Sequence, residues 1–153
     1  MKSKNSRVMG RLFTVAFIVM AFTGFGQMPI FKRYYISDIP GLAWTADYYA
    51  THYIHYLGAI FLLAFFAYAA LNHILSGGKT FSLTVSAYIR LTLLIGIVAT
   101  GILRVLKNLP DVVFSPGLTR FFDIAHLGFM MLYLFFALAF FLLKSGWVRP
   151  RSQ

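Results

Sequence analysis

The four histidines of this chain are the residues whose side chains and spacing could do chemistry. His52, His55 and His73 lie in one apolar stretch from Tyr48 to Leu75, and His126 lies in another. About 20 apolar residues in a helix span the hydrocarbon of a bilayer. Ionisable side chains inside such segments usually have a function. We therefore take the four histidines as the candidate functional residues.

Helical spacing places His55 and His73 on the same face of one helix. They are 18 residues apart, which corresponds to about five turns and about 27 Å of rise. His52 lies one turn before His55, rotated by about 60° around the helix axis. Each end of this segment thus carries an imidazole near a membrane surface. His52 remains the alternative to His55 wherever one ligand is required.

His55 and His126 are a pair of matched depth. If the helices begin near residues 48 and 120, each histidine lies six or seven residues inside its helix, at a depth of about 9–11 Å. Two imidazoles at one depth on different helices of a four-helix bundle suit axial ligation of a haem iron. The pair therefore predicts a site for haem b.

The neighbours of the pair also suit a porphyrin. Gly58 follows His55 by one turn, and Gly128 follows His126 by two residues, so both leave room for a bulky macrocycle. Cationic side chains near this end of the bundle could bind the haem propionates. These cations are Arg104, Lys107 and Arg120.

Other interpretations of the histidines remain open. His73 could ligate a second haem with Met9 or with a residue of another subunit, could hydrogen-bond a quinone carbonyl, or could be an ordinary helix-end residue. His52 and His55 could be packing residues among interfacial tyrosines. A zinc site would need three or four close ligands, and only Asp123 and His52 could join the pair.

Composition identifies the fold class. The chain has 153 residues, of which 59% are hydrophobic and 12% charged, and its mean hydropathy is +0.75. A soluble domain of this length could not bury so much apolar surface. We expect an all-α integral membrane four-helix bundle that forms one transmembrane domain over residues 1–153. Its spans are predicted at about 8–28, 48–75, 85–106 and 120–144, and Arg90 is expected to reach back to the lipid headgroups.

The charges predict how the bundle is oriented. The chain has 14 Lys and Arg against four acids, a formal net charge of +10. Nine of the cations and none of the acids fall on the side of the termini, so the positive-inside rule places both termini in the cytoplasm. The nine are Lys2, Lys4, Arg7, Arg11, Lys79, Arg90, Lys144, Arg149 and Arg151. The expected location is the inner (cytoplasmic) cell membrane, as a multi-pass protein in contact with lipid.

Two classes of function are disfavoured. No soluble segment interleaves basic residues with exposed aromatics, so we expect no nucleic-acid partner. Cysteine is absent, which excludes disulfides, thiolate metal sites, iron–sulfur ligation and c-type haem attachment within the chain.

Three segments resemble a known family. TGFGQMP at 23–29, THYIHYLGA at 51–59 and AHLGFM at 125–130 are similar to the b-type cytochrome membrane subunits of respiratory formate dehydrogenases and nickel–iron hydrogenases. The resemblance implies a four-helix bundle with cytoplasmic ends that binds haem b. That family has a ligand in its first span and two in its fourth. This chain has no histidine in its first span and one in its fourth, so two bis-histidine haems are not implied.

The expected function is electron transfer between a peripheral redox partner and the quinone pool, menaquinone or ubiquinone. The resemblance implies an iron–sulfur or multihaem cytochrome subunit as a partner. It also implies a catalytic subunit, which would carry out the reaction of the complex. The alternative is a non-redox membrane anchor or assembly subunit of such a complex. A small transporter or proton channel is disfavoured, because the spans contain almost no acids.

Overall fold

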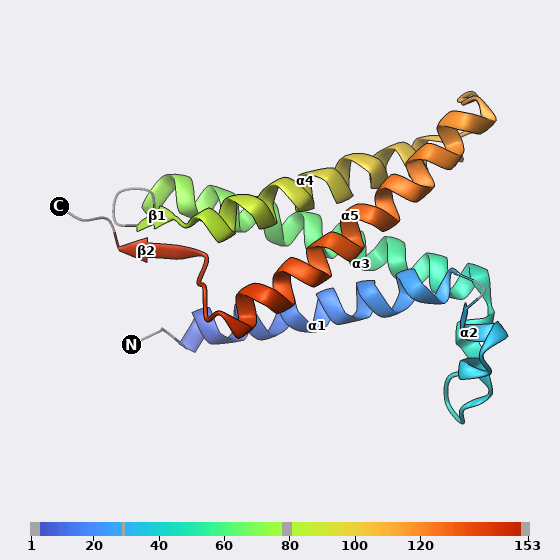
Figure 1. Cartoon of the computed structure of the whole chain (residues 1–153), viewed down its shortest axis with the longest axis horizontal. Helices are drawn as coiled ribbons and strands as arrows, with labels where there is room; N and C mark the ends of the chain where they lie inside the picture. The colour runs from blue at the N-terminus through green and yellow to red at the C-terminus, as the bar shows by residue number, and fades with distance from the viewer. Residues whose placement is uncertain (1–3, 29, 78–80, 151–153) are drawn as a thin grey trace. The chain divides into compact units, whose positions relative to one another are not determined.

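The computed structural model describes residues 4–28, 30–77 and 81–150, without the side chains of residues 4–7, 76 and 77. Several cations used to predict the orientation therefore lie outside the described residues or side chains: Lys2, Lys4, Arg7, Lys79 and Arg151. The chain divides into two compact units, Met1–Leu75 and Ser76–Gln153. Each unit is built around a pair of long helices (Figure 1).

The four long helices confirm the prediction of an all-α fold. They are α1 (Lys4–Gly26), α3 (Tyr48–Asn72), α4 (Val85–Leu106) and α5 (Pro116–Leu142). Each includes a segment long and apolar enough to cross a membrane: Val8–Gly26, Tyr48–Leu75, Val85–Leu106 and Pro116–Leu142. Many large apolar side chains on these helices are exposed, as expected where lipid takes the place of water. In length and composition the four apolar helices suit a multi-pass membrane protein.

Polar side chains cap the starts of three helices. The Asp47 carboxylate accepts hydrogen bonds from the backbone at the start of α3, and the Thr84 and Ser115 hydroxyls do the same for α4 and α5. These caps satisfy amide groups that have no partner within the helix. Because Ser115 is the cap and Pro116 suits the first helical position, α5 begins four residues before the predicted start at 120.

This earlier start changes the depth comparison. His126 lies ten residues after Pro116 and His55 seven residues after Tyr48. At 1.5 Å per residue these positions are about 15 Å and about 10 Å from the respective helix starts. The distances of the two histidines from their own helix starts therefore differ by three residues, or about 5 Å.

In the first unit α1 and α3 run antiparallel (Figure 1). Gly26 at the end of α1 lies against Thr51 near the start of α3. Phe13, toward the other end of α1, packs on Phe65 and Phe66 with ring centroids 5.3 and 5.7 Å apart. The pairs therefore run in opposite order along the two helices.

The connection between α1 and α3 is formed by short helical turns. They are α2 (Ile30–Arg33), η1 (Ile36–Asp38) and η2 (Ala43–Ala46). The ring of Phe22 in α1 lies 5.1 Å from Phe31 and 6.0 Å from Trp44, measured between centroids. Phe31 and Trp44 of the connection thus pack over the end of α1.

In the second unit α4 and α5 also run antiparallel. Gly96 faces Phe129, and Arg104 further along α4 pairs with Asp123 earlier in α5. Strand β1 (Phe81–Leu83) precedes α4 and pairs antiparallel with β2 (Val148–Pro150), so that Ser82 lies opposite Arg149. These strands are only three residues long, too short to show the alternation of apolar and polar residues that predicts a strand.

The sequence predicts that Arg90 reaches back to the lipid headgroups, but in the structure its side chain is buried in the second unit. Its side chain is 6% exposed, and its Nη2 donates to the Ser145 carbonyl at 2.8 Å. The guanidinium carbon lies 4.9 Å from the ring centroids of both Phe140 and Trp147, a cation–π arrangement. Arg90 is buried because the segment after α5 folds over it and supplies its partners.

The close approach at Gly96 gives a test of the second hairpin. A Cβ at this position would lie 2.9 Å from two ring atoms of Phe129. We expect Gly96→Ala to lower the free energy of unfolding by about 1–3 kcal/mol, as overpacked cores do, measured by reversible denaturation in detergent. Gly10→Ala is the control, because nothing lies within 4 Å of its Cβ position and alanine favours a helix. Stabilisation by both substitutions would contradict the close packing.

Candidate functional site

His55 in α3 faces the first helix of its own unit. Its Nδ1 lies 3.1 Å from the Thr23 hydroxyl oxygen. Gly24, the next residue of α1, lies against the ring, and a Cβ there would be 3.2 Å from the His55 Cε1. Glycine at this position lets the imidazole lie close to the α1 backbone, within reach of Thr23.

The Thr23 hydroxyl also makes a hydrogen bond within its own helix. It donates to the Val19 carbonyl at 2.8 Å, the back-bond that threonine commonly makes in helices. Because a hydroxyl has only one proton, the oxygen then faces His55 as an acceptor. In this arrangement Nδ1 of His55 is the donor to the Thr23 oxygen.

His126 in α5 is held in the same way by α4. Its Nδ1 lies 3.0 Å from the Thr100 hydroxyl oxygen and 3.1 Å from the Ile97 carbonyl oxygen. Thr100 donates its proton to the Gly96 carbonyl at 2.7 Å. Since a carbonyl can only accept, Nδ1 of His126 is the donor. A Cβ at Gly101 would lie 3.3 Å from the His126 Cε1.

Each unit thus contains a half-buried imidazole that makes a hydrogen bond through Nδ1 to the neighbouring helix. Histidine ligands of metals commonly have this arrangement, because the second nitrogen fixes the tautomer and orientation of the ring. His55 and His126 fit the role of axial ligands in this respect.

His52 has different surroundings from His55. Its Nδ1 lies 3.2 Å from the Gln27 side-chain oxygen. Its ring lies between those of Tyr48 and Tyr56, at centroid distances of 5.2 and 4.2 Å. These contacts place His52 in a polar and aromatic layer near the start of α3.

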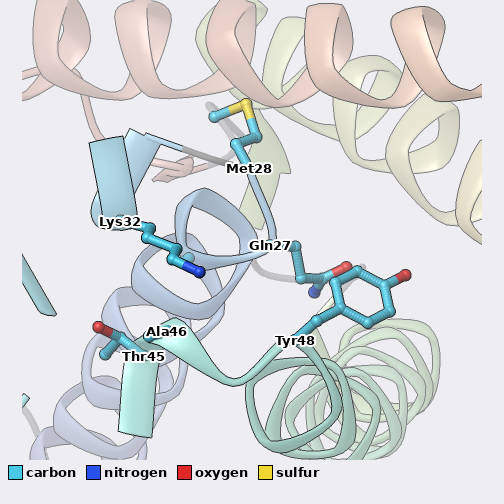
Figure 2. A pocket seen from close by; sticks show the side chains of 7 residues that line it. Gln27, Met28, Lys32, Thr45, Ala46 and Tyr48 are labelled. Carbon is cyan, nitrogen blue, oxygen red and sulfur yellow. The ribbon is translucent and has the colours of Figure 1, made fainter. Parts of the chain in front are cut away.

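Beside this layer lies a hollow of about 190 Å³ (Figure 2). Its lining combines the end of α1, the connection and the start of α3: Gly26, Gln27, Met28, Lys32, Thr45, Ala46 and Tyr48. The Gln27 Nε2 is buried and makes no hydrogen bond within the described part of the chain. The open shape and small size of the hollow suit solvent or a small polar group.

His73 lies at the end of α3, where the helix widens into the π-helical turn η3 (His73–Gly77). Its backbone amide donates to the carbonyls of Ala69 and Ala70. Its side chain is half-buried and makes no hydrogen bond with the described residues. The ligand, quinone and helix-end interpretations of His73 therefore all remain predictions.

The predicted porphyrin neighbours lie in different settings. Gly58 lies against the Met20 side chain of α1. Gly128 is exposed, and in the described structure nothing lies within 4 Å of the position of a Cβ there. Arg120 is exposed at the start of α5.

The other two predicted cations form an ion-pair cluster with Asp123. The Arg104 Nε and the Lys107 Nζ each lie 2.8 Å from the Asp123 Oδ1. The three side chains are between 20% and 40% exposed. Asp123 precedes His126 by one turn, so this cluster marks the end of the hairpin where His126 lies.

Zinc coordination finds no support in the residues present. Nowhere within 4–28, 30–77 and 81–150 do three or more His, Cys, Asp or Glu side chains gather as a metal site would require. Haem iron needs only two axial protein ligands, so this observation bears on zinc alone.

Thr23 and Thr100 were not among the predicted site residues. Each is followed by glycine and lies on the helix that precedes the one carrying the histidine. The repeated Thr-Gly pair was the available signal. It was hidden because threonine and glycine are also common at plain helix contacts in membranes.

Comparison of the chain with protein-family models, with curated proteins and with solved structures finds no match in any of the three.

The Asp123 cluster gives a test of the electrostatics at this end of the second hairpin. We expect Asp123→Asn to lower the free energy of unfolding by about 1 kcal/mol, because partly exposed ion pairs are weak. The loss should shrink as salt is raised, since ions screen exposed charges. Denaturation of wild type and variant at low and high salt measures both effects.

Asp111→Asn is the matched control, because Asp111 is exposed and forms no ion pair with the described residues. An Asp123→Asn loss that does not depend on salt would show that the ion pairs are not its cause.

Proposed function

We propose that this chain is a haem b-binding membrane subunit of a respiratory oxidoreductase complex. In this role it transfers electrons between a peripheral redox partner and the quinone pool. His55 and His126 are the proposed axial ligands. Catalysis on the substrate of the complex belongs to the partner subunits, and both termini of this chain lie in the cytoplasm.

One observation carries the proposal: each unit holds an apolar-helix histidine by a hydrogen bond at Nδ1. The bonds are 3.1 Å from His55 to Thr23 and 3.0 Å from His126 to Thr100. A neutral imidazole so held has its lone pair on Nε2, the atom that would ligate iron. Two such rings in one chain meet the requirement of a bis-histidine haem.

The apolar helices and the cationic side chains also suit a haem site within a membrane. A porphyrin is mostly apolar, and the helices that carry the histidines are apolar and contain few charged side chains. The propionates require cations, which Arg104, Lys107 and the exposed Arg120 can supply. Arg104 and Lys107 would then divide their charge between a propionate and Asp123.

Bound haem would supply reversible one-electron chemistry at its iron. The chain's own residues would hold the imidazoles, exclude water with apolar helices and bind the partner through exposed basic residues. The same kind of hydrogen bond to the histidine within each unit favours the redox role over that of a non-redox anchor.

The test is haem binding by this chain in the purified complex. We expect the protein produced with its membrane partners and an adequate haem supply to give the reduced-minus-oxidised spectrum of haem b. His55→Ala and His126→Ala should each abolish or strongly reduce it, because each removes a proposed iron ligand. Haem content per chain measures the effect.

His52→Ala is the matched control, since His52 lies one turn from His55 but faces Gln27 and two tyrosines. We expect this variant to keep its haem. A wild-type complex without haem would overturn the proposal and leave the non-redox anchor. Loss of haem in His52→Ala with retention in His55→Ala would move the ligand to His52.

A further inference from the structure

The two units repeat one local arrangement. Thr23-Gly24 on α1 contacts His55 on α3, and Thr100-Gly101 on α4 contacts His126 on α5. The distances agree closely: 3.1 and 3.0 Å from hydroxyl oxygen to Nδ1. The positions of a glycine Cβ agree as well, at 3.2 and 3.3 Å from Cε1. Independent packing accidents would not be expected to match in the residue types, their order and all these distances.

The threonine proton has the same destination in both units. It goes to the carbonyl four residues earlier, at 2.8 Å for Thr23 and 2.7 Å for Thr100. Both threonines are buried, at 1% and 8% exposure, so water does not compete for the hydroxyl. Each hydroxyl oxygen is thereby fixed as an acceptor that faces the histidine.

The glycine after each threonine makes the contact possible. A Cβ at Gly24 or Gly101 would lie closer to the imidazole than ordinary van der Waals contact, so the ring would have to move away. With glycine, the ring lies against the backbone and its Nδ1 reaches the hydroxyl. The small residue and the hydroxyl therefore act as one unit.

We infer that Thr23, and Thr100 together with the Ile97 carbonyl, are positioning groups that hold His55 and His126 as Nδ1–H tautomers and direct the Nε2 lone pairs to a metal. For haem iron this inference rests on the proposed function. An acceptor at Nδ1–H makes the imidazole a stronger electron donor through Nε2. The two threonines would therefore stabilise ferric over ferrous iron and lower the reduction potential.

Tautomers can be measured without haem. In ¹⁵N-histidine-labelled protein in detergent, the wild type should show Nδ1 protonated and Nε2 unprotonated for both rings. Thr23→Val should change the Nδ1 and Nε2 resonances of His55. Thr100→Val should shift those of His126 but keep the tautomer, because the Ile97 carbonyl still accepts from Nδ1.

With haem bound, both valine variants should move the reduction potential upward, and Thr100→Val should move it less because the Ile97 carbonyl still accepts from Nδ1 of His126. They should also bind haem about 10-fold more weakly, the low end of the usual cost of losing such a partner. Thr23→Ser and Thr100→Ser keep the hydroxyl and should restore the wild-type potential. A loss of packing alone would not be corrected by serine, which lacks the methyl group that valine retains.

Thr14→Val is the matched control. Thr14 lies on α1 and back-bonds to the Gly10 carbonyl at 2.9 Å, but it is exposed. Its replacement should leave the histidine resonances and the potential unchanged.

The inference is overturned if the wild-type rings are Nε2–H tautomers. It is also overturned if the valine variants keep wild-type resonances and potential. Absence of haem from the wild type would refute the proposed function instead, and the tautomer measurement would still decide whether the threonines set the ring state.

Discussion

The hydrogen bond between a helix-bound threonine and a histidine on the next helix is the contact on which each unit depends. In an apolar surrounding, a polar ring without a partner is costly, so this contact restricts how the two helices can slide. His55 reaches Thr23 and His126 reaches Thr100 only at one register of each helix pair. Interhelical hydrogen bonds in membranes contribute about 0.6–2 kcal/mol. Their effect on register is therefore larger than their energy alone suggests.

Glycines at the helix contacts allow the close packing that these hydrogen bonds require. Without a hydrophobic driving force between helices in lipid, association depends on close packing and polar contacts. Gly24 and Gly101 admit the rings, and Gly96 admits Phe129. At the other end of the second hairpin the charged side chain of Arg90 is buried. It donates a hydrogen bond to the Ser145 carbonyl and lies against two aromatic rings, which stabilise the buried charge.

The four long helices could be predicted from the sequence because length and apolar composition are strong signals. The start of α5 was placed too late, since the cap Ser115 and Pro116 were read as part of the connection. The strand pair and the burial of Arg90 depend on the segment after α5 returning to the start of α4. Such a long-range contact leaves no local pattern in the sequence.

The histidines of the candidate site were predictable because polar residues stand out in an apolar segment. Their threonine partners were not, because threonine is ordinary in a membrane helix. Gly58 was chosen from its spacing to His55, but its Cβ position lies against Met20. Spacing along one helix shows on which face a residue lies. It does not show which residue of the neighbouring helix packs against that face.

The choice of a hydroxyl rather than a carboxylate as the partner of each histidine follows from the apolar surroundings. A carboxylate would hold an imidazole more strongly, but its charge would be expensive to bury without a cation. A threonine that gives its proton to its own helix is a neutral acceptor and needs no counter-charge. Consistent with this, the acid nearest His126 is Asp123, near the helix start and paired with Arg104 and Lys107. The hydrogen bonds of His55 and His126 to their neighbouring helices are thus made with groups that carry no charge.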